Sequence, residues 1–167
     1  MRKFLQILTF KPFAAGARVA LAALTLGLLG TVPFTKPAIS QPPSPLVGVW
    51  IDHTGRGAVE ISACGNSLCG HIAWLKEPNQ PNGKPLVDKK GRPVCGLQII
   101  GEVKRKADGT WDEGWIYDPE EDEQYSVELK MKSPDTLQVL GYLGVKLLGE
   151  TYEWKRAPNS QSRCMKA

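Results

Sequence analysis

The residues of this chain best suited to chemistry are two histidines, four cysteines and a run of carboxylates. Nucleophilic catalysis needs a nucleophile beside a base, usually a histidine that a third group orients. His53 and His71 lie in no recognisable catalytic motif. His71 alternates with Cys69 and Ala73, which indicates a partly exposed position on a strand. We therefore expect no catalytic residues and a protein that is not an enzyme.

Metal binding is a second possibility for these side chains. Cys64, Cys69, His71 and Cys95 are of the types that bind zinc, but their spacing matches no standard zinc pattern. Export to an oxidising compartment would also favour disulfides over thiolate ligands. We expect neither a metal site nor a cofactor.

Five carboxylates surround Pro119 and offer oxygen ligands for a hard cation such as calcium. They lack the spaced Asx ligands and the glycine at a sharp bend that calcium loops use. Because aromatic stretches flank the run, a solvated hairpin turn is the preferred interpretation. The residues are Asp118, Glu120, Glu121, Asp122 and Glu123.

The cysteines are better explained as disulfide candidates. Cys64 and Cys69 flank a four-residue turn between two alternating segments, where a short bridge would join the strands of a hairpin. Cys95 and Cys164 either pair across the domain or stay free. The spacing alone does not choose between these two states.

Aromatic side chains are the remaining candidates for a functional site. If they lined a cavity, they would select an apolar or amphipathic ligand by shape, with few polar anchors. Alternatively, the rings fill the interior and leave no room for a ligand. The candidate ligand-binding residues are Trp74, Trp111, Trp115, Tyr117, Tyr125 and Tyr152, with Trp154 as a further possible member.

The first forty residues are typical of a secretory signal peptide. They hold five basic residues, no acidic residue and an apolar core over 19–29, and small residues at Ala38 and Ser40 indicate cleavage before Gln41. A retained anchor helix is the alternative. Without the five basic residues, the mature chain has 16 Lys and Arg against 17 Asp and Glu. We expect a periplasmic or secreted protein, with no nucleic-acid partner and no stable membrane insertion after cleavage.

Short alternating segments across 41–167 predict an all-β domain. We expect a Pro-rich lead over 41–46, a domain over 47–157 and a C-terminal tail over 158–167. Short connections favour an antiparallel meander, which eight strands can close into a barrel, with an open sheet or a sandwich as the alternatives. The expected strands are 47–52, 57–63, 68–75, 97–105, 110–117, 124–131, 136–142 and 148–156.

The connection over 76–96 is long, basic and rich in proline and glycine. A loop of this length in so small a domain is often functional. It would lie across the mouth of the barrel as a lid, or present a basic surface to a partner. A solvated, poorly ordered excursion is the third interpretation.

Several ordered motifs resemble the bacterial family called domain of unknown function 2147. They run through the mature chain as Gly48-x-Trp50, Leu68-Cys69-Gly70-x-Ile72-x-Trp74, Arg92-Pro93-x-x-Gly96, Trp111-x-x-Gly114-x-Ile116-Tyr117-Asp118-Pro119 and Gly149-x-Thr151-x-x-Trp154-x-Arg156. The resemblance implies a small exported protein of a Gram-negative bacterium, and it implies no particular activity. The chain departs from the family before Arg92-Pro93, where the family's longer Asp/Asn/Pro-rich stretch is reduced to Asp88-Lys89-Lys90-Gly91.

A second resemblance is to lipocalins and related calycin barrels. In those barrels a Gly-x-Trp on the first strand packs beneath an arginine of the closing strand, and Trp50 and Arg156 stand at matching places. The resemblance implies a lipocalin-like barrel closed by this pair. An ordinary core tryptophan beside an unrelated arginine is the alternative, and Trp154 is a competing partner for Arg156.

Two functions follow from these observations. The first is an exported barrel that binds a small apolar or amphipathic molecule, with the loop over 76–96 near its mouth. The second is an envelope interaction or structural module with a filled barrel, which uses that loop or a flat face to hold a protein or cell-wall partner.

Overall fold

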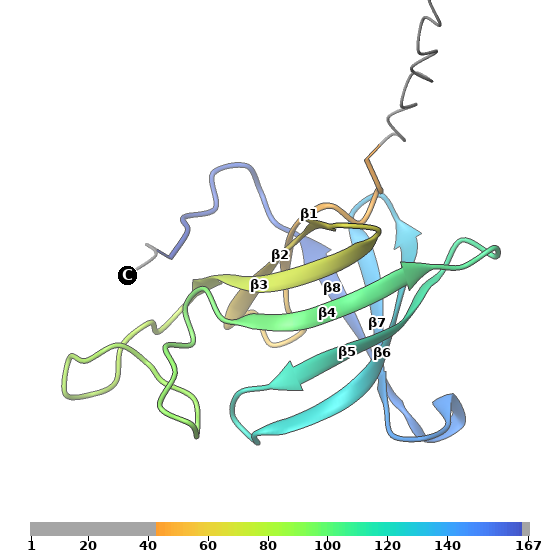
Figure 1. Ribbon diagram of the computed structural model, residues 1–167. Helices are drawn as coiled ribbons and strands as arrows, with labels where there is room; N and C mark the ends of the chain where they lie inside the picture. The colour runs from red at the N-terminus through yellow and green to blue at the C-terminus, as the bar shows by residue number, and fades with distance from the viewer. Residues whose placement is uncertain (1–42, 165–167) are drawn as a thin grey trace, which may run out of the picture. The chain divides into compact units, whose positions relative to one another are not determined.

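The protein is described by a computed structural model over residues 43–164 (Figure 1). The expected signal peptide and its cleavage site lie outside the described residues. The strands are β1 (Gly48–Ile51), β2 (Gly57–Cys64), β3 (Ser67–Leu75), β4 (Gln98–Arg105), β5 (Trp111–Asp118), β6 (Glu123–Ser133), β7 (Thr136–Tyr142) and β8 (Glu150–Arg156), with a 3-10 turn η1 (Lys146–Leu148) before β8.

The eight strands form an antiparallel meander that closes on itself. Each strand pairs with the next, and β8 returns to β1 with Trp50 opposite Arg156 and Ile51 opposite Lys155. The prediction of an all-β, eight-stranded lipocalin-like barrel is confirmed, and the open sheet and the sandwich are not formed. β8 begins at Glu150 rather than at 148 because η1 occupies the preceding residues.

The core lies inside this cylinder and follows the alternation of side chains along the strands. On β6, Val127 and Leu129 are fully buried, whereas Glu128 and Lys130 point outward. Burial of such aliphatic side chains stabilises the fold by about 1.5–3 kcal/mol each. The largest fully buried side chains are Trp50, Leu46, Ile61, Leu68, Ile100, Leu129, Leu137, Val103, Val127 and Val139.

Strict alternation fails on β4. Ile99 and Ile100 are both buried, although neighbours on an ideal strand face opposite sides. Glu102 has a φ of 59°, and the pairing of β3 with β4 shifts register at Gly70. These irregularities rotate the strand locally and add Ile100 to the core.

Arg156 and Trp50 close one end of the barrel. The guanidinium carbon lies 4.1 Å from the centre of the Trp50 ring, and the guanidinium donates to the backbone carbonyls of Pro45, Val47 and Pro134. The Trp50 indole donates to the carbonyl oxygen of Leu46 at 2.8 Å. Leu46 is itself 1% exposed, so the irregular segment before β1 contributes a core residue.

The chain has two disulfides: one spans a hairpin turn, and the other joins residues that are far apart in the sequence. Cys64 pairs with Cys69 across the turn between β2 and β3. Cys95 pairs with Cys164, which resolves the alternative that the sequence left open. The segment after β8 is therefore attached to the barrel, and the Cys164 amide also donates to the Ala73 carbonyl at 2.6 Å.

Candidate functional site: a cavity at the open end of the barrel

The end opposite Arg156 opens into a cavity of about 1120 Å³. Four connections form its mouth: those between β1 and β2, β3 and β4, β5 and β6, and β7 and β8. Ligand sites in proteins commonly measure about 300–1,000 Å³. The cavity, which extends from the connecting loops to the first inward-facing strand residues, is therefore large enough for a small molecule.

The inner wall of the cavity is apolar. Ile72, Ile99, Val139 and Trp154 line it and are each at most 7% exposed. Gly141 on β7 also lines it, and a methyl group added at this glycine would meet no atom within 4 Å. The chain thus leaves usable space in front of Gly141.

The structure separates the six aromatic candidates into two groups. Tyr117, Tyr125 and Tyr152 line the cavity. The three tryptophans of the prediction, Trp74, Trp111 and Trp115, lie outside the lining. Trp115 instead covers Gly101, where a β-carbon would lie 2.4 Å from its ring.

The aliphatic wall and Gly141 are not among the residues predicted from the sequence. The signal for the wall was present, because Ile72, Ile99 and Val139 fall on apolar faces of alternating segments. An alternating pattern shows which side chains face inward. It does not show which of them border a hollow and which pack against each other.

The loop over 76–96 lies at the mouth and is ordered by its own backbone. Two isolated bridges pair Asn79 with Pro85 and Val87 with Pro93, so the loop folds into two small hairpin-like turns. Leu86 and Val94 reach the cavity lining and join the core. The loop therefore lies beside the mouth, as expected, with Leu86, Asp88 and Val94 turned inward while most of its other residues are exposed to solvent.

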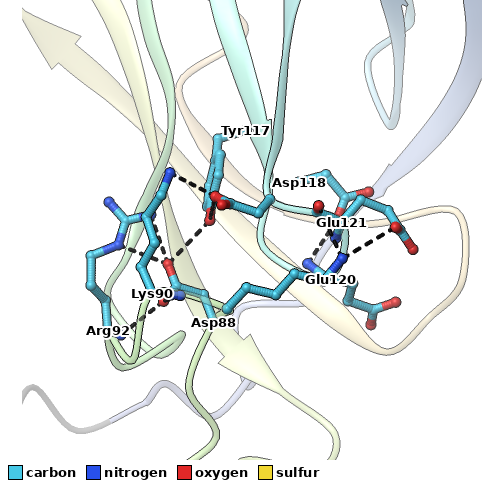
Figure 2. A network of polar contacts seen from close by, with 9 residues as sticks. Asp88, Lys90, Arg92, Tyr117, Asp118, Glu120 and Glu121 are labelled. Carbon is cyan, nitrogen blue, oxygen red and sulfur yellow. Dashed lines mark hydrogen bonds and ion pairs between the residues drawn. The ribbon is translucent and has the colours of Figure 1, made fainter.

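A polar cluster fastens this loop to β5, as Figure 2 shows. The Asp88 side chain is 0% exposed and accepts hydrogen bonds from the backbone amides of Lys90 and Arg92 and from the Arg92 guanidinium at 2.7 Å. The Tyr117 hydroxyl lies 3.2 Å from Asp88 Oδ2 and 2.8 Å from Asp122 Oδ1. Lys90 completes the cluster with an ion pair to Asp122 at 2.6 Å.

Two opposing effects set the pKa of Asp88. Burial alone would raise it, but the hydrogen bonds from Arg92 and Tyr117 outweigh that effect, so the pKa lies below its ordinary value of 3.8. The pKa of Asp122 is also lowered, chiefly by its bond to Lys90. Burial and the bond to Asp122 raise the pKa of Tyr117, which stays a neutral donor.

The acidic turn after β5 faces basic side chains of the mouth. Glu120 pairs with Arg56 at 3.0 Å, and Glu121 pairs with Lys89 at 3.4 Å. The Asp118 side chain accepts hydrogen bonds from the backbone amides of Glu120 and Glu121, which is the pattern of an Asx turn. The expected solvated turn is therefore joined to neighbouring loops by exposed ion pairs, each worth about 1 kcal/mol or less.

The candidate metal-binding and catalytic side chains have other contacts. Cys64, Cys69 and Cys95 are in disulfides, whose sulfur atoms no longer act as thiolate ligands. His53 stacks on Tyr152 at the mouth with ring centres 4.0 Å apart, and the Tyr152 hydroxyl donates to Glu150. These contacts place two flat rings beside the entrance.

This combination defines the class of protein: an eight-stranded antiparallel barrel around an apolar cavity, with an arginine over a tryptophan at the closed end, is a lipocalin-like barrel. A solved structure described as "Protein HP1028 from the human pathogen Helicobacter pylori belongs to the lipocalin family" has a similar fold. The TM-score is 0.56 and the identity 15%, over 68% of this chain and 84% of the other. At this identity the likeness concerns the fold.

The chain belongs to the family described as "Uncharacterized protein conserved in bacteria (DUF2147)", whose model matches residues 48–156. That range covers every strand of the barrel. No protein with a curated description matches the chain. Membership in a bacterial family and two disulfides fit a protein outside the cytoplasm.

Within residues 43–164, no helix has the length and apolar composition needed to cross a lipid bilayer.

Proposed function

We propose that this protein binds a small apolar or amphipathic molecule inside the barrel and does not catalyse a reaction. The observation that carries the proposal is the cavity of about 1120 Å³ with buried aliphatic walls. An apolar ligand gains about 25 cal/mol for each Å² that it removes from water.

The mouth supports an amphipathic ligand in particular. Tyr117, Tyr125 and Tyr152 line the outer part of the cavity together with charged residues of the connecting loops. An apolar tail would lie against Val139 and Trp154, while a polar head would meet hydroxyl and charged groups near the entrance.

A filled envelope module that uses the loop over 76–96 has less support. The pocket at the open end favours a ligand over a filled barrel, and three of the five basic side chains of that loop pair within the chain: Lys89 with Glu121, Lys90 with Asp122 and Arg92 with Asp88. We further propose that the first forty residues direct export and that the protein acts in the periplasm or outside the cell.

Native mass spectrometry of the protein purified from its own bacterium tests these proposals. The expected spectrum shows a chain beginning at Gln41 with an additional small mass that organic solvent removes. The stripped protein should then melt at a higher temperature with oleate. A bare chain mass together with no thermal shift from oleate, a retinoid or haem would contradict ligand binding, and an uncleaved chain would contradict processing at Ser40.

A further inference from the structure

We propose that the β7–β8 connection is a membrane-docking tip, which inserts reversibly into the surface of a neutral phospholipid bilayer and brings the cavity mouth to the lipid. This inference rests on the proposed ligand-binding function. The tip is residues 143–149, Leu-Gly-Val-Lys-Leu-Leu-Gly.

The tip gathers most of the exposed large apolar side chains of the described residues. Within 43–164 there are five, and four of them lie here: Leu143 at 64% exposed, Val145 at 56%, Leu147 at 93% and Leu148 at 78%. Exposed apolar residues are ordinary when scattered, but a contiguous group indicates an interaction site. Figure 1 shows the connection, with η1 in it, as a separate loop standing away from the strands.

The tip presents hydrocarbon without a free charge. Its one charged residue, Lys146, turns back to the outer wall of the barrel, where its ammonium pairs with Asp112 and Glu128. Tyr142 donates to the same Asp112 at 3.0 Å. Because a charge that enters the apolar part of a bilayer is costly, holding Lys146 away leaves the leucines free to insert.

The size and composition of the tip favour a bilayer over a protein partner. It has seven residues, whereas a stable protein interface uses about 20–30 residues a side. It also lacks the tryptophan, tyrosine and arginine that dominate the binding energy of protein interfaces. A few aliphatic side chains suffice for weak, reversible binding at the boundary between headgroups and acyl chains.

The position of the tip connects docking to the cavity. Leu143, at its start, and Leu148, one residue before its end, also line the cavity mouth. The apolar surface therefore runs from the tip into the barrel without an intervening charged residue of this connection. An amphipathic ligand leaving a bilayer would meet hydrocarbon along this path, which lowers the cost of transfer through water.

Flotation with vesicles of dioleoylphosphatidylcholine tests the proposal on the full mature domain. The wild type should float with the vesicles, and Val145→Asp with Leu147→Asp should reduce the bound fraction about tenfold or more. Neither residue lines the cavity. Leu147→Trp should raise the bound fraction, because an indole favours the membrane interface.

A matched control carries the same two added charges at the other end of the barrel. Asn66→Asp with Ala107→Asp changes two exposed turn residues and should float as the wild type does. A wild type that stays in solution overturns the proposal. A tip variant that floats as well as the wild type also overturns it. The same holds if the wild type does not bind the vesicles while its tip crosslinks to a protein.

Oleate titration in vesicle-free buffer separates this proposal from the ligand-binding function. The tip variant should bind oleate as the wild type does, which assigns its defect to docking. If the wild type floats but does not bind oleate, the function of the cavity is wrong and the docking tip stands. If it binds oleate but does not float, docking alone is overturned.

Discussion

Two side chains, Arg156 and Asp88, hold the two ends of the barrel. Arg156 uses the fixed fork of its guanidinium to reach three backbone carbonyls while its face covers the Trp50 ring. At the mouth, the Asp88 carboxylate accepts hydrogen bonds from two backbone amides, the Arg92 guanidinium and the Tyr117 hydroxyl. Each joins segments that are distant in sequence, so single substitutions there should have separable effects.

Arg156→Lys keeps the charge but removes the fork, and an ammonium cannot make the same set of contacts. We expect a loss of about 1–2 kcal/mol in the free energy of unfolding, from the weakened cation–π contact and the lost hydrogen bonds. Urea denaturation would show a lower midpoint with an unchanged slope. Arg156 does not line the cavity, so a matching loss of oleate affinity would contradict its assignment to the closed end.

Acid should release the loop over 76–96 from the mouth. The folded-state pKa values of Asp88 and Asp122 lie below 3.8. Their contribution to loop attachment is therefore complete above about pH 3.8 and is lost as the pH falls through the lower folded-state values. Hydrogen exchange should show protection of the Lys90 and Arg92 amides at pH 5, and a progressive loss of that protection as the pH is lowered below 3.8, while the strands remain protected.

Asp88→Asn should show the same loosening at neutral pH, with exchange about tenfold faster at those two amides. Asp108→Asn is the matched control, because Asp108 accepts from Thr110 in the β4–β5 turn and its pKa is also lowered. It should change exchange in that turn only. Equal protection of the loop in the wild type and in Asp88→Asn would contradict the role of this carboxylate.

Among the elements, the two disulfides enclose very different lengths of chain. Cys64 and Cys69 are five residues apart, whereas Cys95 and Cys164 are 69 apart. The longer bridge ties the segment after β8 to the end of the β3–β4 connection. A crosslink that closes a longer loop removes more entropy from the unfolded chain.

Replacing Cys95 and Cys164 with serine should cost about 4 kcal/mol, and replacing Cys64 and Cys69 about 2 kcal/mol, on the chain-entropy estimate. Thermal and urea unfolding of the two double variants would measure the difference. The reverse order of costs would contradict this account. It would show that the short bridge has a larger local role in joining β2 to β3.

The elements themselves were largely predictable from the sequence. Alternation on β6 and short turns such as 107–109 determine where strands start, stop and pair, and the eight expected strands lie within about two residues of those observed. Alternation alone would not place Ile100 and Leu46 in the core, because a backbone irregularity and an irregular lead bring them there. Local patterns do not encode such long-range packing.

The candidate site was less predictable for a related reason. Tyr117, Tyr125 and Tyr152 line the cavity, but the sequence does not distinguish them from Trp111 or Trp115, which pack elsewhere. The partners of Asp88 lie both near it in sequence and 29 residues away, at Tyr117. Asp88 and Tyr117 come together at the cavity mouth only when the barrel has closed.

At the scale of the whole molecule, the barrel has one closed and one open end. Arg156 and Trp50 hold the closed end, while four connecting loops surround the mouth of the apolar cavity. The loop over 76–96 is fastened by charge, and the tip over 143–149 is left apolar. The two ends therefore differ in role: the closed end stabilises the barrel, and the open end is where a ligand would bind.

Calorimetric titration of oleate into the wild type and into Gly141→Phe tests ligand binding at the open end. A side chain at Gly141 enters open space in the cavity, so the variant should keep its melting temperature while oleate affinity falls about tenfold or more. Gln138→Phe, on the same strand and facing outward, should bind as the wild type does. Equal oleate affinity in a folded Gly141→Phe variant, or no binding by the wild type, would contradict the account.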